Sequence, residues 1–194
     1  VFKGKFSKNI GKINTISTLL KLLDKKKFLK NKKFEFVIIK NIPNQAGMGG
    51  GSMNAASLIN FFIKKKLFKM SNNDLIKLAN QIGSDVILGI NPKNTILCAN
   101  GKIKKFSKNI NLYTLVVKPN FGCSTKYIYS KVKSFSKPKF SSPKQSMLQV
   151  KYLKTLDNNL ETIVFKKYPQ LKSIKAYLLN LRNNMFVRMS GSGS

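Results

Sequence analysis

The sequence predicts an α+β fold, because strand-like runs and longer helix-like runs follow one another over 194 residues without a regular repeat. Amphipathic stretches at helical spacing recur along the chain. An Asn-Gly pair between two apolar runs indicates a β-hairpin, which a strict strand–helix–strand repeat would not contain. Apolar residues make up 42% of the chain, which is enough to build a core.

The first expected helix covers residues 15–29, where apolar side chains recur at helical spacing. Residues 33–40 alternate and then become fully apolar, which is typical of a strand. A second helix is expected over residues 52–68, with Ser52 as its N-cap.

A third helix is expected over residues 71–82, with Ser71 as the N-cap and Asp74 completing an approximate capping box. Residues 83–90 predict a turn that leads into a short buried strand. Residues 95–106 predict a hairpin that turns at Asn100-Gly101.

The second half of the chain continues the mixture of strands and helices. In chain order we expect a strand at 112–119, a short helix at 124–132, a polar loop at 134–146, helices at 148–167 and 169–182 with Pro169 in the first turn of the latter, and a last strand at 183–189.

The chain is strongly basic, with a formal net charge of +31 from 37 Lys and Arg against 6 Asp and Glu. Such a charge is found in proteins that bind nucleic acids or anionic membranes. However, the lysines are spread over every segment, and Arg182 and Arg188 are the only arginines, although arginine is the preferred residue for bidentate phosphate contacts. We therefore favour a solvated basic surface, with no nucleic-acid partner.

Residue usage also excludes several kinds of site. The chain has no His and only two cysteines, Cys98 and Cys123, which disfavours a zinc site, His-based catalysis and a disulfide framework. The longest apolar runs fall short of the ~20 residues that span a bilayer. We therefore expect a protein of the reducing cytoplasm with no membrane segment.

Both ends suggest an incomplete chain. It begins with Val1 rather than Met, and it stops in the sequence Met-Ser-Gly-Ser-Gly-Ser. We expect further residues beyond both ends.

A glycine-rich loop, "NQAGMGGGSMNAA", lies between the strand expected at 33–40 and the helix expected at 52–68. A helix N-terminus has unpaired N–H groups and positive potential, and glycines let its backbone approach phosphate oxygens. The loop matches neither G-x-x-x-x-G-K-S/T, because no Lys precedes Ser52, nor G-x-G-x-x-G. The alternative is a tight turn with a glycine-lined helix contact.

Residues 43–56, "PNQAGMGGGSMNAA", resemble the P-x-x-x-G-L-G-S-S-A-A motif of the GHMP kinases. In the same order, "IGSDVILGI" resembles the G-A-D-V-P segment, "VVKPNFGCSTKYIYS" resembles a V-x-P-x-x-x-x-S-T-x-x-x-Y stretch, and "MSGSGS" resembles the C-terminal glycine motif of these kinases. The triple glycine is most similar to the branch that acts on 4-diphosphocytidyl-2-C-methyl-D-erythritol. These matches span nearly the whole chain.

This resemblance implies the GHMP kinase fold. An N-terminal ATP-binding α+β domain, related to a ribosomal-protein domain, would cover residues 1–118, and a C-terminal α/β sandwich domain would cover residues 119–194. The resemblance also implies ATP-dependent phosphorylation of the 2-hydroxyl of 4-diphosphocytidyl-2-C-methyl-D-erythritol, in the non-mevalonate isoprenoid pathway. The enzyme would be a monomer or a weak homodimer.

Two alternatives remain open at this point. Another GHMP kinase would act on homoserine, mevalonate or a sugar, and a basic nucleic-acid-binding module would bind a duplex in a salt-sensitive way.

Three positions depart from the family pattern. Met48 replaces a Leu and Ser84 replaces an Ala, both small changes. Met53 replaces a Ser, so that a hydroxyl is lost at the start of the expected helix.

Asp85 is the strongest candidate for a catalytic base among the six acidic residues. It follows a Gly-Ser turn and precedes an apolar run, where an unneeded charge would be costly, although a turn-capping carboxylate is the alternative. The other five have simpler explanations: Asp24 and Glu35 on solvent faces, Asp74 as a cap, and Asp157 and Glu161 on the polar face of a late helix.

The resemblance assigns roles to particular residues. Asp85 matches the catalytic aspartate, and the partner Lys, in an A-K-I/L-N segment, is expected before Val1. Tyr129 matches an aromatic residue that packs on cytosine, with a core-facing residue as the alternative. Mg²⁺ would be held mainly by ATP. The expected ATP-binding residues are Pro43, Asn44, Gln45, Ala46, Gly47, Met48, Gly49, Gly50, Gly51, Ser52 and Met53.

Overall fold

The computed structural model describes residues 1–8, 10–44, 46–98, 102–107 and 110–193. The chain forms two compact units. The first consists of residues 1–44 and 49–92, and the second of residues 45–48 and 93–194. Helices and short strands occur in both units, as an α+β fold requires. The domain boundary expected between residues 118 and 119 stays a prediction.

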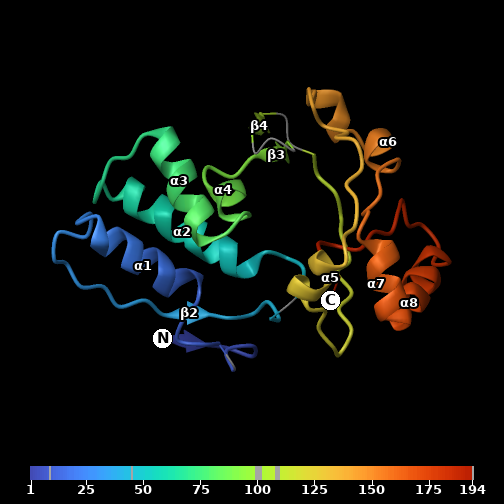
Figure 1. The fold of residues 1–194 in the computed structure, drawn as a ribbon, viewed down its shortest axis with the longest axis horizontal. Helices are drawn as coiled ribbons and strands as arrows, with labels where there is room; N and C mark the ends of the chain where they lie inside the picture. Colours follow the sequence, from blue (N-terminus) through green and yellow to red (C-terminus); the bar gives the residue numbers. More distant parts are fainter. Residues whose placement is uncertain (9, 45, 99–101, 108–109, 194) are drawn as a thin grey trace. The chain divides into compact units, whose positions relative to one another are not determined.

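The first unit is a group of helices beside a short parallel strand pair (Figure 1). Residue Phe2 pairs with Ile38, and Lys3 pairs with Ile39. The elements of the unit are β1 (Phe2–Lys3), α1 (Thr15–Lys25), β2 (Ile38–Ile39), α2 (Gly50–Lys64), α3 (Asn72–Ile82) and α4 (Val86–Gly89).

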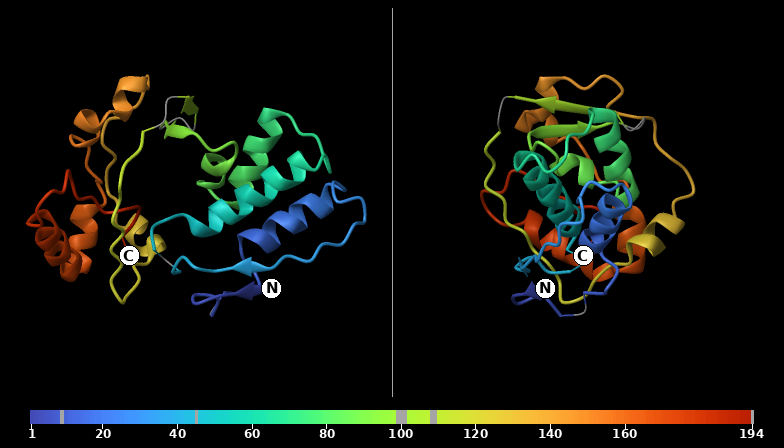
Figure 2. Two further views of the ribbon diagram at one scale, coloured as in Figure 1. Left: turned by 180° about the vertical axis from the view of Figure 1, so that it is seen from behind. Right: turned by 90° about the vertical axis from the view of Figure 1, so that its left-hand side faces the viewer.

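Helix α2 is the centre of this unit and contacts α1, α3 and α4 (Figure 2). Its mainly apolar sequence allows burial on more than one side. Ile59 and Phe62 are fully buried together with Leu19 and Leu23 of α1 and Leu78 of α3. The rings of Phe34, Phe36, Phe61 and Phe68 pack around that of Phe62.

The capping residues fix where α1 and α3 begin. The side chain of Asn14 accepts bonds from the N–H groups of Ile16 and Ser17. The Ser71 hydroxyl accepts from the Asp74 N–H at 3.1 Å and donates to its carboxylate at 2.7 Å. The predicted cap at Ser71 is therefore confirmed.

Two predictions for the first unit are wrong. Ser52 is not an N-cap, because α2 begins at Gly50 and its N-cap is Gly49. Residues 86–89 form a helical turn rather than a strand. An apolar run this short does not distinguish strand from helix, and here contacts with α2 and α3 decide the outcome.

The second unit begins with an antiparallel hairpin, as expected. Strand β3 (Asn94–Leu97) pairs with β4 (Ile103–Phe106), and the predicted turn at Asn100-Gly101 lies outside the described residues. Further along the chain are α5 (Thr125–Ser130), the 3₁₀ helix η1 (Gln145–Leu148), α6 (Val150–Leu153), α7 (Glu161–Lys167) and α8 (Pro169–Leu179).

A small core holds α5, α7 and α8 together. Cys123, Ile128, Val164 and Leu171 are buried in it, and Met189 packs against them. Pro169 is the first residue of α8, as predicted, because its fixed φ suits a first helical turn. Helices α7 and α8 lie side by side in this unit (Figure 1).

The second unit also departs from three predictions. Residues 112–119 and 183–189 were expected to be strands, but the structure assigns neither segment to a strand or a helix. The helix expected over 148–167 is broken into η1, α6 and α7. The break falls where the Asn158 side chain accepts a bond from the Leu160 N–H, which competes with helix continuation.

No helix within the described ranges combines the length and the apolar character that crossing a membrane requires.

The contact of α4 with α2 generates a testable prediction for stability. A Cβ placed on Gly89 would lie 2.6 Å from the Ala56 Cβ, which is fixed within α2. We expect Gly89→Ala to lower the free energy of unfolding by about 1–3 kcal/mol through overpacking. Urea denaturation measures this change.

The exposed Gly11 is the matched control, because a Cβ there would meet only the Ile13 carbonyl at 3.6 Å. We expect Gly11→Ala to leave stability nearly unchanged. Equal stability of the two variants would contradict the described packing of α4 on α2.

Candidate functional site

The N-terminus of α2 is an open helix end. Gly49, its N-cap, has φ of 60°, in the left-handed region that favours glycine, and offers no side chain to cap the helix. The first helical hydrogen bond runs from the Met53 N–H to the Gly49 carbonyl at 2.9 Å. The N–H groups of Gly50, Gly51 and Ser52 precede this bond and can therefore serve an anion.

Residues of the first unit contact the first turn of α2 at Gly51, Ser52 and Met53. The Thr15 hydroxyl donates to the Gly51 carbonyl at 2.7 Å, so that α1 packs closely on the first turn of α2. The Ser52 hydroxyl lies 3.6 Å from a Cβ placed on Gly83, toward the turn that leads to Asp85. The Met53 sulfur lies 2.9 Å from a Cβ placed on Gly89, so that Met53 packs against α4.

Asp85 lies beside the loop. Its Oδ2 is 3.8 Å from a Cβ placed on Gly49, and the Ser84 hydroxyl donates to its Oδ1 at 3.3 Å. The carboxylate is exposed, so that the cost of burial expected from the sequence does not apply. Its side chain also makes no capping bond to α4. The turn-capping alternative is therefore not what the structure contains.

Lys40 is a residue that the sequence analysis missed. This residue is 8% exposed. The Lys40 Nζ donates to the Ile42 carbonyl at 2.6 Å, and the same Nζ lies 3.5 Å from a Cβ placed on Gly50. Burial lowers the pKa of the Lys40 ammonium. A buried cation beside the positive end of α2 is unfavourable until an anion arrives. The available signal was a single Lys at the end of the apolar run "FVII".

Part of the loop belongs to the second unit. Gly47 has φ of 63°, and its carbonyl accepts a bond of 2.6 Å from the Ser190 hydroxyl. A Cβ on Gly47 would lie 2.7 Å from the Ser190 carbonyl oxygen, so that only glycine fits there. Ala46 is buried, whereas Met48 is 43% exposed.

The remaining loop positions make weaker contacts. Pro43 is half-buried, and the exposed Asn44 amide donates to the carbonyls of Phe6 and Lys8 at 3.5 and 3.4 Å. Gln45, also predicted to bind ATP, lies outside the described residues.

Tyr129 lies on α5 in the second unit and is 57% exposed. The alternative of a core-facing residue is therefore not observed, and the ring is free to stack on a base. Tyr127 has a different environment, since the ammonium groups of Lys131 and Lys167 each lie 5.3 Å from its ring centre.

A cavity of about 390 Å³ occurs in the second unit, and it is lined mainly by apolar side chains. Ala46, Met48 and Ser190 contribute to its wall, together with residues 114–117 and α8. Tyr129 does not line this cavity.

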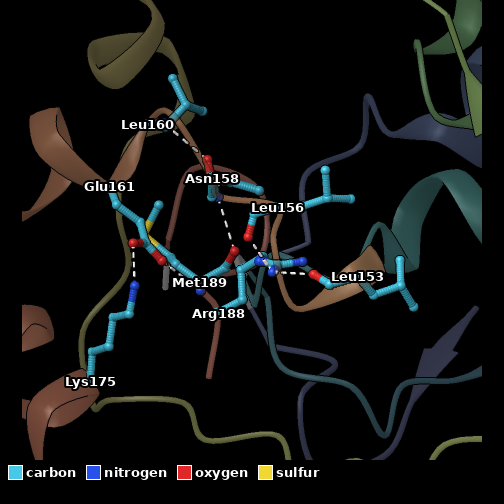
Figure 3. A network of polar contacts seen from close by, with 9 residues as sticks. Leu153, Leu156, Asn158, Leu160, Glu161, Lys175, Arg188 and Met189 are labelled. Atoms are coloured by element: carbon cyan, nitrogen blue, oxygen red, sulfur yellow. Dashed lines mark hydrogen bonds and ion pairs between the residues drawn. The ribbon is translucent and has the colours of Figure 1, made fainter. Parts of the chain in front are cut away.

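The prediction for Glu161 is wrong. It was expected on a polar surface, but its side chain is only 13% exposed and forms an ion pair of 2.5 Å with Lys175. It also accepts a bond from the Met189 N–H at 3.0 Å. Glu161 therefore has a structural role within the second unit (Figure 3).

Known proteins resemble the chain in sequence and in fold. The family model "GHMP kinases N terminal domain" matches residues 14–102. The chain is 67% identical over 193 residues to the 4-diphosphocytidyl-2-C-methyl-D-erythritol kinase of Pelagibacter ubique (strain HTCC1062), covering 100% of this chain and 69% of the relative. The enzyme of the same name from Petrotoga mobilis is 31% identical over 189 residues, covering 93% of this chain and 73% of that relative.

A solved structure shares the fold. The crystal structure of 4-(cytidine 5'-diphospho)-2C-methyl-D-erythritol kinase matches 100% of this chain and 70% of its own chain. The TM-score is 0.64 at 21% identity. The likeness therefore concerns the fold, and it confirms the predicted GHMP kinase architecture.

The buried Lys40 predicts an unusual pH dependence. Its pKa is lowered in the folded protein from the ordinary 10.5, so that the unfolded chain binds more protons between the folded pKa and 10.5. Stability contributed by Lys40 therefore rises with pH in this window. We expect Lys40→Met to remove this gain, so that the difference in unfolding free energy, variant minus wild type, falls as pH approaches 10.5.

Urea denaturation between pH 7 and 10.5 measures this difference. Lys21→Met is the control for the loss of one positive charge, because Lys21 is exposed on α1. The same pH dependence in both variants would contradict the buried environment of Lys40.

Proposed function

Because the chain belongs to the 4-diphosphocytidyl-2-C-methyl-D-erythritol kinases, a branch of the GHMP kinase family, we propose that it phosphorylates 4-diphosphocytidyl-2-C-methyl-D-erythritol. The phosphate donor is ATP, and the acceptor is the 2-hydroxyl of the substrate. The reaction belongs to the non-mevalonate route to isoprenoid precursors, in the cytoplasm, and the enzyme acts as a monomer or weak homodimer.

One observation carries the chemical part of the proposal: the carboxylate of Asp85 lies beside Gly49, the cap of α2. A helix end with free N–H groups attracts phosphate oxygens, and a carboxylate next to it can accept a proton. Phosphoryl transfer to an alcohol needs both groups at one place.

The proposed reaction assigns one step to each group. Asp85 accepts the proton of the substrate hydroxyl while the hydroxyl oxygen attacks the γ-phosphorus of ATP. The new oxygen–phosphorus bond forms as the bond to the β-phosphate oxygen breaks, and ADP leaves. The N–H groups of Gly50, Gly51 and Ser52 bind phosphate oxygens throughout.

The cations of the site balance the phosphate charge. Mg²⁺ would accompany ATP, held mainly by the phosphate oxygens, and would neutralise part of their charge. The Lys40 ammonium also offsets the negative charge of the phosphates, since it lies close to Gly50. The wider excess of lysines adds a positive field that attracts an anionic substrate.

The remaining assignments extend the proposal. Tyr129 stacks on the cytosine ring, which its exposure allows. Residues 43–53 bind ATP, within a domain covering residues 1–118, and residues 119–194 belong to the C-terminal domain.

A substrate panel at fixed ATP tests the proposed function. The full-length gene product is incubated with ATP, Mg²⁺ and, separately, the cytidylyl substrate, homoserine, mevalonate and galactose. We expect ADP release with the cytidylyl substrate alone. Turnover of homoserine or mevalonate without turnover of the cytidylyl substrate would contradict the assignment. Steeply salt-dependent duplex binding without ATP binding would instead support a nucleic-acid-binding module.

Removal of the proposed base tests the mechanism. We expect Asp85→Asn in the full-length gene product to lower kcat by roughly 10²- to 10⁴-fold, because a carboxamide does not accept the proton. ATP affinity should change little, since the phosphates bind backbone N–H groups. Steady-state kinetics and ATP titration measure the two effects.

Asp74→Asn is the matched control, because it removes the same charge from the start of α3. It should lower stability slightly and leave kcat unchanged. Undiminished turnover in Asp85→Asn would remove Asp85 from the mechanism.

A further inference from the structure

A carboxamide on α2 holds the end of the short helix α4. Asn60 is half-buried and interrupts an otherwise apolar stretch of α2, "LINFFI". Its Nδ2 donates to the Gly89 carbonyl at 2.9 Å, and its Oδ1 accepts from the Asn91 N–H at 3.4 Å. Because one bond uses the donor side of the carboxamide and the other uses the acceptor side, its orientation is fixed. Asn60 therefore ties α2 to the backbone at the end of α4.

Helix α4 has a single turn and depends on its contacts with α2, beside which it lies (Figure 1). Val86 and Ile87 are buried, and a Cβ placed on Gly89 would meet the Ala56 Cβ at 2.6 Å. These apolar contacts hold α4 against α2 but have no preferred direction along the α2 axis. Hydrogen bonds are directional, so that the two bonds of Asn60 fix the position of α4 along this axis.

Asp85 lies at the other end of the same turn. It is the N-cap of α4, and its carbonyl accepts a bond of 3.1 Å from the Leu88 N–H. Its carboxylate Oδ2 lies 3.8 Å from a Cβ placed on Gly49, the N-cap of α2. A shift of α4 along α2 would therefore change the distance between this carboxylate and the N–H groups at the start of α2.

Helix α2 carries both reference points of this arrangement. Its N-terminal N–H groups begin at Gly50, and Asn60 lies roughly 15 Å farther along the same axis at 1.5 Å per residue. Ile59 and Phe62, on either side of Asn60 in sequence, are fully buried and keep this part of the helix in place. The residues concerned all belong to the first unit.

We propose that Asn60 is a positioning residue for Asp85: its carboxamide fixes α4 along α2 and so places the carboxylate at a set distance from the start of α2. This inference rests on the proposed function, in which Asp85 is the base and the start of α2 binds phosphate. A base must lie within hydrogen-bond reach of the hydroxyl that it deprotonates. A displacement of about 1 Å is enough to lose much of its effect.

Asn60→Leu removes both bonds at similar side-chain size and tests the proposal in the full-length gene product. We expect kcat to fall roughly 10- to 100-fold, because the carboxylate is no longer held in place. KM for ATP should change less than about twofold, since the N–H groups at the start of α2 are unaltered. Steady-state kinetics, well below the melting temperature of each protein, measure both. Asn73→Leu makes the same change at an exposed position of α3 and should keep the wild-type kcat.

A combination with Asp85→Asn separates positioning from a general loss of folded enzyme. If Asn60 acts through Asp85, then Asn60→Leu should lower kcat in the wild type and hardly change the residual kcat of Asp85→Asn, which has no carboxylate to place. A loss of folded enzyme would instead lower kcat by the same factor in both backgrounds. That result would overturn the inference.

Gly89→Ala displaces the same turn by a different route, because its Cβ would collide with that of Ala56. We expect the same pattern as for Asn60→Leu: a lower kcat, an unchanged KM for ATP, and no further fall in combination with Asp85→Asn. This variant decides the question if Asn60→Leu does not fold.

The outcomes separate this inference from the proposed function. Wild-type protein that does not phosphorylate the cytidylyl substrate, or undiminished turnover in Asp85→Asn, contradicts both. Low turnover in Asp85→Asn together with an unchanged kcat in Asn60→Leu or Gly89→Ala contradicts this inference alone. A rise in KM for ATP at unchanged kcat would also overturn it, since Asn60 would then serve the nucleotide rather than the base.

Discussion

The open N-terminus of α2 is the feature on which the candidate site depends. The helix begins at Gly50 behind a left-handed Gly49, which has no side chain to cap it. Its first N–H groups therefore remain free for a phosphate, at the end of the helix where the macrodipole is positive. The burial of Ile59 and Phe62 farther along the same helix fixes this end in the first unit. Core packing thus supplies the rigidity that an anion site needs.

Two charged side chains of the first unit lie beside this helix end. Asp85 supplies a carboxylate, and Lys40 supplies a buried ammonium that interacts unfavourably with the helix dipole in the absence of an anion. The positively charged helix end and the lysine together favour a bound anion, and we propose that the phosphates of ATP fill this role. Within the second unit, the preceding Gly47 accepts a bond from the Ser190 hydroxyl.

Local patterns predicted the local features of the fold well. Helices 15–25 and 72–82 and the cap at Ser71 follow from periodicity and short-range bonds. Features that depend on tertiary contacts were predicted less well. The turn at 86–89 is helical because of contacts with α2 and α3, and the segments expected to be strands at 112–119 and 183–189 are coil. Similarly, elimination among six acidic residues leads to Asp85 as a candidate, and its role stays a prediction. Asn158 and Glu161 both bond to Met189, 31 and 28 positions along the chain, and periodicity does not reveal such contacts. The burial of Lys40 is likewise a tertiary feature.

The central claim is that phosphate binds at the start of α2, and amide resonances of the ¹⁵N-labelled protein test it most directly. Titration with ATP, ADP and adenosine would be followed at Gly49, Gly50, Gly51 and Ser52. We predict large shifts of these amides with ATP and ADP and small shifts with adenosine, because the phosphates make the contact. Equal shifts with adenosine, or no shift at these four amides while ATP binds elsewhere, would contradict the claim.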